Sequence, residues 1–184
     1  LILRCESKKI IEPRIVYGHF ECRKQENALL VSSPGPVEKV RRFEFPRQRQ
    51  SPNLCISDFF PDGFVTMQLV TIGDKVAEEG MKLFKENKYS EVFYLKGLAS
   101  ELAEATAEYS NRLIREELGV PEHAGARFSF GYPAAPQNLD QKKLYALLGG
   151  GRIGVKLTET CHLVPEHSTS AIVSVSPDAK HFHP

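Results

Sequence analysis

The sequence predicts an α+β fold with a largely antiparallel sheet flanked by helices. Short β-branched and aromatic runs lie towards both ends of the chain with helical patterns between them, and the βαβα alternation typical of a parallel sheet is missing. The 184 residues, 41% of them hydrophobic, are enough to bury one core. We therefore expect a single domain over residues 1–184, with residues 1–11 as an N-terminal helical remnant.

The first part of the chain predicts β-structure. Four runs are rich in β-branched and aromatic residues, and they are separated by polar residues 21–27 and by a Pro-Gly-Pro turn at residues 34–36. Gly73 ends the last run. The expected strands cover residues 14–20, 28–33, 37–45 and 64–72.

The first helix of the middle part is expected to begin after Asp74, a good N-cap residue, and to close at Asn87 and Lys88. Acidic residues lie early in this segment and basic residues late, which matches the helix dipole. Its inner face is marked by Val76, Gly80, Leu83 and Phe84.

A second, longer helix is expected over about residues 92–118, with Gly119 and Pro121 ending it. Apolar residues recur in it at helical spacing, which indicates an amphipathic stripe. The residues of this predicted stripe are Leu98, Leu102, Ala105, Tyr109 and Leu113.

The last part of the chain predicts mixed structure. Residues 127–136 form a proline-bounded loop rich in aromatic residues, and a short helix over residues 139–148 stops at three glycines, 149–151. Two further strands are expected at residues 154–163 and 169–176.

Composition excludes several classes of protein. The 24 Lys and Arg residues balance 23 Asp and Glu residues, so no global field favours nucleic acid, and no uncharged run approaches the roughly 20 residues of a membrane span. The N-terminus lacks a signal-peptide pattern. Four cysteines without a CxxC pair predict reduced thiols rather than disulfides or zinc, so we expect a cytoplasmic protein. From the charge balance and the short uncharged runs, we expect neither nucleic-acid nor membrane partners.

Three other features could suggest a ligand, but each has a simpler interpretation. The triple glycine follows a helix and lacks a phosphate-loop pattern, so a helix C-cap is favoured. A histidine group near Cys161 lacks metal-ligand spacing, so no metal site is expected. A basic stretch with interleaved phenylalanines suits an anionic small ligand or an acidic partner surface better than nucleic acid. The histidines are His162, His167, His181 and His183, and the basic residues are Lys39, Arg41, Arg42, Arg47 and Arg49.

An acidic stripe follows the long helix, because Glu101, Glu104 and Glu108 share one face. One interpretation is a solvated salt-bridge face in which Arg112, four residues after Glu108, supplies the counter-charge. The other is a carboxylate that pairs with a cationic ligand, such as a sulfonium or ammonium group.

The densest signal is the segment from Arg127 to Pro133, which reads RFSFGYP. An arginine can grip a carboxylate with two hydrogen bonds, Gly131 permits close backbone approach, and aromatic residues can pack on a ligand face. The segment therefore suits a pocket for a small ligand that carries a carboxylate and an aromatic group. A structural aromatic loop explains the same residues equally well.

A series of short motifs runs in order through nearly the whole chain. They are Ile11-Glu12-Pro13, Val16-Tyr17-Gly18, Phe45-Pro46-Arg47-Gln48, Ser57-Asp58-Phe59, residues 102–109 (LAEATAEY), Arg127-x-x-x-Gly131-Tyr132-Pro133, Lys156-Leu157-Thr158-Glu159 and residues 176–180 (SPDAK). This series resembles the activation (reactivation) domain of vitamin B12-dependent methionine synthase. That family has an α+β fold with an antiparallel sheet and flanking helices.

The resemblance implies a function. The family's domain binds S-adenosylmethionine and presents its methyl group to cobalamin carried by a separate domain. After accidental oxidation to cob(II)alamin, an electron donor such as flavodoxin reduces the cobalt, and the methyl group then remethylates it. We expect the chain to support this reaction without turnover of its own, as an excised domain or as a stand-alone protein, and its short C-terminal end favours the stand-alone form.

The resemblance also implies which residues bind S-adenosylmethionine. Arg127 would grip the carboxylate, Glu104 would lie near the cationic part, the backbone from Phe128 through Ser129 and Phe130 to Gly131 would hold the ligand, and Tyr132 would support the pocket. The family has an aromatic pair where this chain has His181 and Phe182, and Ala135 replaces the family's Cys. No residue is expected to be catalytic or to bind a metal. The alternative is a scaffold that docks a corrinoid protein without binding S-adenosylmethionine.

Overall fold

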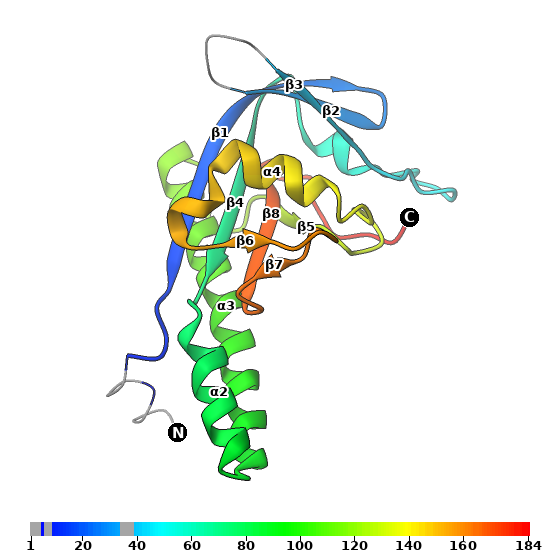
Figure 1. Cartoon of the computed structure of the whole chain (residues 1–184). Coiled ribbons are helices and arrows are strands. Elements are labelled where there is room, and N and C mark those ends of the chain that lie inside the picture. The colour runs from blue at the N-terminus through cyan, green and yellow to red at the C-terminus, as the bar shows by residue number, and fades with distance from the viewer. Residues whose placement is uncertain (1–4, 6–8, 34–38) are drawn as a thin grey trace.

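The computed structural model describes Cys5, residues 9–33 and residues 39–184. Six strands form one sheet in the order β3-β2-β1-β4-β8-β5, and every neighbouring pair is antiparallel (Figure 1). The predicted α+β class with a largely antiparallel sheet is therefore confirmed. The strands of this sheet are β1 (Arg14–Gln25), β2 (Ala28–Ser32), β3 (Val40–Glu44), β4 (Gly63–Thr71), β5 (Ala126–Ser129) and β8 (Ser168–Ser174), while β6 (Lys156–Leu157) and β7 (Leu163–Val164) pair in a separate two-stranded sheet.

Helices cover both faces of this sheet. Gln68 and Leu69 are neighbours on β4 and must point to opposite faces. Gln68 donates a hydrogen bond to the carbonyl of Ala107 in α3, whereas Leu69 lies beside Gly150 in η2, directly after α4. The helices are α2 (Lys75–Lys85), α3 (Tyr89–Leu118) and α4 (Asp140–Leu148), with short 3-10 turns η1 (Ile56–Phe59) and η2 (Gly150–Ile153). None of the helices within the described residues is long and apolar enough to cross a membrane.

The first strand is longer than predicted, because polar residues 21–25 continue it. Cys22 is buried between exposed neighbours, which is the alternation of a half-buried strand, and it pairs with Val31 of β2. The predicted strand at 37–45 is observed as residues 40–44. Its first two residues, the turn at 34–36 and most of the remnant at 1–11 lie outside the described residues.

The long helix packs through a different face from the predicted stripe. Ala105 and Tyr109 of that stripe are exposed, and its three leucines lie only at the border of the buried face. Small side chains explain the difference, since alanines let the helix lie close to its neighbours. The residues buried on α3 are Leu95, Ala99, Ala103, Ala107, Ser110, Asn111, Ile114 and Arg115. The predicted inner face of α2 holds except for Phe84, which is 59% exposed.

Both expected glycine caps are confirmed. Gly119 ends α3 and Gly149 ends α4, each with a backbone φ near +65°. Asp74 lies at the N-cap position of α2 but makes no side-chain capping hydrogen bond.

The last part of the chain contains one strand that the sequence did not predict. Residues 126–129, expected in a loop, pair with β8 as the edge strand β5. The strand expected at 154–163 was wrong: only β6 and β7 form there, and a turn with Cys161 at a φ of +64° lies between them. The strand expected at 169–176 is β8.

Candidate functional site

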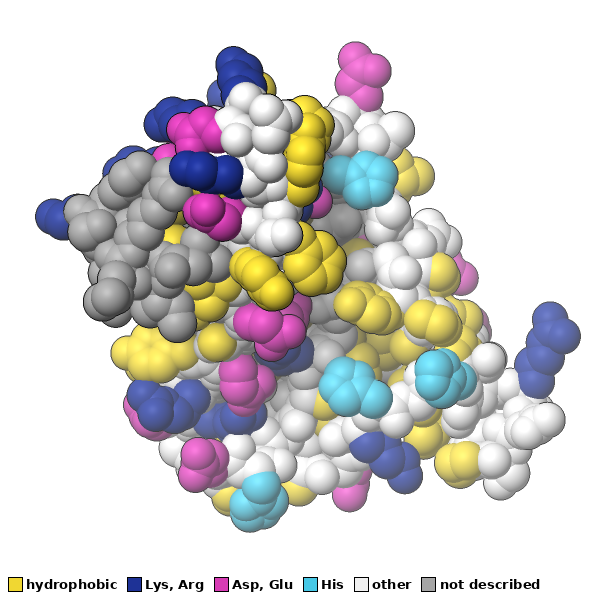
Figure 2. Space-filling view, turned by 90° about the horizontal axis from the view of Figure 1, so that it is seen from below, with side chains coloured by type: hydrophobic (Ala, Val, Ile, Leu, Met, Phe, Trp, Pro, Cys, Tyr) yellow, Lys and Arg dark blue, Asp and Glu magenta, His cyan; other side chains and the backbone are white. Residues whose placement is uncertain are grey.

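A pocket of about 700 Å³ lies between the outer face of α3, β5 and the C-terminal segment 179–183. Six of the nine sequence-predicted site residues line it: Glu104, Arg127, Ser129, Tyr132, His181 and Phe182. The face drawn in Figure 2 carries acidic side chains next to partly covered basic ones, with histidines nearby. The volume of the pocket falls in the range of about 300–1,000 Å³ that is typical of small-molecule sites.

The alternation of strand β5 decides which residues of the RFSFGYP segment reach the pocket. Arg127 and Ser129 point into it, whereas Phe128 is 4% exposed and stacks on Phe59 at 5.8 Å between ring centroids. Phe130, 8% exposed, stacks on Phe43 instead. The two phenylalanines therefore anchor the segment in the core, and only their backbone can contact a ligand.

A tight turn follows β5 and forms part of the pocket rim. The Gly131 N–H donates to the carbonyl of Ala135, and the Ala135 N–H donates to the carbonyl of Tyr132. Gly131 has a φ of +88°, and a Cβ there would lie 2.9 Å from Oδ1 of Asn138, so glycine is required. Tyr132 is 66% exposed at the rim.

The acidic stripe of α3 meets the arginine of β5. Nη2 of Arg127 donates to Oε2 of Glu104 at 2.9 Å, and its Nε lies 3.5 Å from Oε2 of Glu108. Within the described part of the chain, no partner is seen for Nη1 of Arg127. The arginine thus has one edge held by two carboxylates and one edge that can still donate to a ligand.

The expected counter-charge for Glu108 was wrong. Arg112 pairs instead with Glu116 at 3.5 Å and lies over the ring of Tyr109. Glu108 is bound by Arg115 at 2.6 Å, seven residues further along the same helix. Sequence reasoning missed Arg115, although a spacing of seven residues returns a helix to the same face.

The C-terminal segment forms the opposite wall and is fixed by aromatic contacts. The ring of His181 lies 5.6 Å from that of Phe128, and the ring of Phe182 lies 6.1 Å from that of Phe59. Nε2 of Gln48 donates to the carbonyl of His183 at 2.6 Å.

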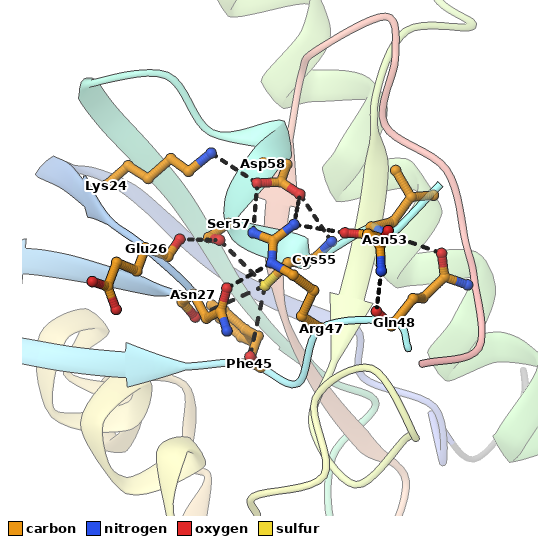
Figure 3. Close-up of polar contacts among 11 residues, drawn as sticks. Lys24, Glu26, Asn27, Phe45, Arg47, Gln48, Asn53, Cys55, Ser57 and Asp58 are labelled. Atoms are coloured by element: carbon orange, nitrogen blue, oxygen red, sulfur yellow. Dashed lines mark hydrogen bonds and ion pairs between the residues drawn. The ribbon is translucent and has the colours of Figure 1, made fainter. Parts of the chain in front are cut away.

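An ion-pair network holds the loop that contains Gln48, the residue whose side chain binds this wall (Figure 3). Arg47 donates from Nη1 and Nη2 to the two oxygens of Asp58, at 2.7 and 2.9 Å, and Lys24 donates to Asp58 at 2.8 Å. The N–H of Cys55 donates to the same carboxylate. Hydrogen bonds from the Arg47 guanidinium hold the pKa of Asp58 well below its usual range.

The other features singled out in the sequence lie outside this pocket or serve the fold. Arg47 and Arg42 of the basic stretch bind Asp58, Gln25 and Glu44 within the chain. Among the described residues, no three or more His, Cys, Asp or Glu side chains gather where they could hold a metal ion. Burial lowers the pKa of His167. All four cysteines are buried, and none of them forms a disulfide within the described residues.

The chain is similar to proteins of known function. A sequence model of the family described as vitamin B12 dependent methionine synthase, activation domain, matches residues 1–183. Methionine synthase of Mycobacterium tuberculosis (strain ATCC 25618 / H37Rv) is 38% identical over 200 residues, which cover 92% of this chain. The Mycobacterium leprae (strain TN) methionine synthase is 37% identical over the same share. This chain spans 17% of the length of each.

A solved structure shares the fold. The crystal structure of the MetH reactivation domain bound to AdoHcy superposes with a TM-score of 0.86 and 23% identity, and the match covers 99% of this chain and 64% of that one.

Proposed function

Because the chain belongs to the family of vitamin B12-dependent methionine synthase activation domains, we propose that it binds S-adenosylmethionine in the pocket beside Arg127. There it would support the reductive remethylation of a cobalamin carried by another domain or subunit. The observation that carries this proposal is the pairing of Nη2 and Nε of Arg127 with Glu104 and Glu108, which leaves Nη1, without a partner among the described residues, to donate to a ligand in the pocket. A planar guanidinium recognises a carboxylate best through such an edge.

Charges in the pocket suit the amino-acid part of S-adenosylmethionine. That part carries a carboxylate and an ammonium group, and the sulfonium adds a second positive charge. Arg127 would bind the carboxylate, while Glu104, whose side chain is 59% exposed beside it, would bind the ammonium. The backbone of residues 128–131 and the ring of Tyr132 would contact the rest of the ligand.

Positioning is the contribution that this chain would make to the reaction. The partner would hold the cobalamin, which after one-electron reduction by a flavodoxin-like or other donor would supply a nucleophilic cobalt for the sulfonium methyl group. The sulfur would keep the electrons of the broken carbon–sulfur bond, so S-adenosylhomocysteine would remain in the pocket. By holding the ligand in one orientation, Arg127 and Glu104 would lower the barrier to this transfer.

The wall formed by residues 181–183 would help to hold the methyl donor, S-adenosylmethionine. His181 is exposed and Phe182 half-buried, and both are tied to the core through Phe128 and Phe59. The imidazole of His181 would cover one side of the ligand in place of the family's aromatic residue. We also propose a cytoplasmic location, since four buried cysteines kept as thiols suit a reducing compartment.

Titration calorimetry with S-adenosylmethionine and S-adenosylhomocysteine tests the binding step. We expect both to bind the wild type and Arg127→Ala to weaken S-adenosylmethionine by at least about 30-fold, since removing a charged partner of a carboxylate costs roughly 2–3 kcal/mol. Arg112→Ala, which removes an exposed arginine of α3, is the control and should bind normally. No binding at millimolar ligand would favour the docking scaffold that lacks the ligand, whereas equal binding by Arg127→Ala would show that the ligand does not bind through Arg127.

A further inference from the structure

Arg115 is a buried charge in the wall of the pocket. Its side chain is 10% exposed, and it lines the pocket from the last turns of α3. A buried guanidinium is costly unless it is paired, and replacing a buried ion pair by apolar groups is often neutral or stabilising. Stability alone therefore does not account for an arginine here.

A chain of contacts links Arg115 to Arg127 through one carboxylate. Nη2 of Arg115 donates to Oε1 of Glu108 at 2.6 Å, while Oε2 of the same carboxylate lies 3.5 Å from Nε of Arg127. Nδ2 of Asn111 also donates to that Oε2, at 3.5 Å. Residues 104, 108, 111 and 115 recur at helical spacing, so one face of α3 carries the whole arrangement.

Glu108 needs this support because it is otherwise free to move. Its side chain is 56% exposed, and an exposed glutamate has several accessible rotamers. A second glutamate, Glu104, already binds Nη2 of Arg127. When Glu108 is fixed as well, both carboxylates occupy the same edge of the Arg127 guanidinium, and the other edge keeps a defined direction.

We propose that Arg115 is a positioning residue, which acts through Glu108 to orient Arg127 towards the ligand carboxylate. The inference rests on the proposed function and deepens it, because it names what makes the site selective for a carboxylate-bearing sulfonium. Arg115 would not touch the ligand carboxylate itself. The Nε of Arg115 is buried without a hydrogen-bond partner within the described residues, so the bond from Nη2 to Glu108 is the contact that fixes this guanidinium.

A pair of ligands isolates this role. S-adenosylmethionine and its decarboxylated analogue share the adenosine, the sulfonium and the amine, and they differ only in the carboxylate. The ratio of their two affinities measures the grip of Arg127 on that group. A general loosening of the pocket would weaken both ligands together and leave the ratio unchanged.

The test compares this ratio in the wild type, Arg115→Met, Arg115→Lys and the control Arg112→Met. We expect Arg115→Met to lower the ratio about tenfold, equivalent to 1.4 kcal/mol, with the decarboxylated analogue bound within twofold of wild type. Arg115→Lys should recover part of the ratio and Arg112→Met all of it. Thermal unfolding establishes that each variant is folded.

Glu108→Gln provides a second route if Arg115→Met does not fold. It removes the charge that links the two arginines, and it should lower the same ratio. An unchanged ratio in the folded variants overturns the role of Arg115 while leaving the proposed function in place. A wild type that binds neither ligand overturns the proposed function, and this inference with it.

Discussion

Replacing Asp58 by asparagine is expected to lower the free energy of unfolding by about 2 kcal/mol. The carboxylate accepts two hydrogen bonds from Arg47, one from Lys24 and one from the N–H of Cys55. Hydrogen bonds to charged groups contribute roughly 1.5–3 kcal/mol, and partial exposure of the Arg47 and Asp58 side chains, at 34% and 27%, places the loss in the lower part of that range. Asparagine keeps one acceptor oxygen but loses the charge.

Differential scanning calorimetry measures this loss. An unfolding entropy of about 2.1 cal/mol/K per residue converts 2 kcal/mol into a fall in melting temperature of roughly 5 °C for a chain of this size. The matched control is Glu44→Gln, because the Arg42–Glu44 pair is exposed and should contribute less than about 0.5 kcal/mol.

The pH dependence of the difference adds a second criterion. The pKa of Asp58 is lowered in the folded protein, chiefly by its hydrogen bonds from Arg47, so its contribution is fully present above the unfolded pKa of about 3.9. It is lost as the pH falls through the lower folded pKa. The difference in the free energy of unfolding between wild type and Asp58→Asn should be constant from pH 6 to 8 and shrink below about pH 4. A variant as stable as Glu44→Gln, or a gap that does not shrink in acid, would refute the reasoning.

Three further substitutions or treatments have defined outcomes. Gly150→Ala should lower the free energy of unfolding by about 1–3 kcal/mol in urea denaturation, because its Cβ would lie 2.4 Å from Cδ2 of Tyr145. Gly151→Ala, whose Cβ would lie 3.4 Å from the nearest atom, should lower it by less than about 1 kcal/mol. Equal losses in the two variants would contradict this packing. Burial and a nearby carboxylate raise the pKa of Cys22 to about 11, so this thiol should not react with a disulfide reagent at pH 8 until the chain unfolds, and rapid native-state labelling at Cys22 would show that the strand opens. Glu104→Gln should weaken both S-adenosylmethionine and S-adenosylhomocysteine about five- to tenfold by calorimetry, since the two ligands share the ammonium group that Glu104 would bind; unchanged affinities would remove Glu104 from the ligand site.

The sheet and helices followed from local patterns, but the face on which α3 packs did not. Leu98 and Leu102 are larger and more hydrophobic than Ala99 and Ala103, so the sequence favoured the leucine stripe. The structure instead buries Ala99 and Ala103 in a cluster with Ile72, Val76 and Leu83, because small side chains let α3 lie close to α2, and the two leucines pack only at the border of this cluster. This choice depends on tertiary packing, and no local pattern reports it.

The sequence did not predict the edge strand β5, because this strand also depends on a tertiary contact. It is only four residues long and is followed by a turn at Gly131, so its composition reads as a loop. Pairing with β8 makes it a strand, and that pairing alone decides that Phe128 enters the core while Arg127 faces the pocket. Such a contact joins segments more than 40 residues apart.

The candidate site was predicted in part. Arg127 and Glu104 stood out because their charges suit a zwitterionic ligand, and the structure brings them to 2.9 Å. The role of Arg115 was not predictable, since Arg112 is a closer partner of Glu108 in sequence. Only the direction of each side chain, set by burial of one helix face, distinguishes the two arginines.

The most direct test of the account is remethylation in a reconstituted reaction. A cobalamin-dependent methionine synthase that lacks its activation domain is oxidised, then mixed with this protein, S-adenosylmethionine and a one-electron reductant, and the absorbance of the methylated cobalamin is followed. The account predicts that the signal appears with the wild-type protein and is lost with Arg127→Ala, while Arg112→Ala retains it. Equal signals with and without the protein, at concentrations where it binds S-adenosylmethionine, would contradict the central claim.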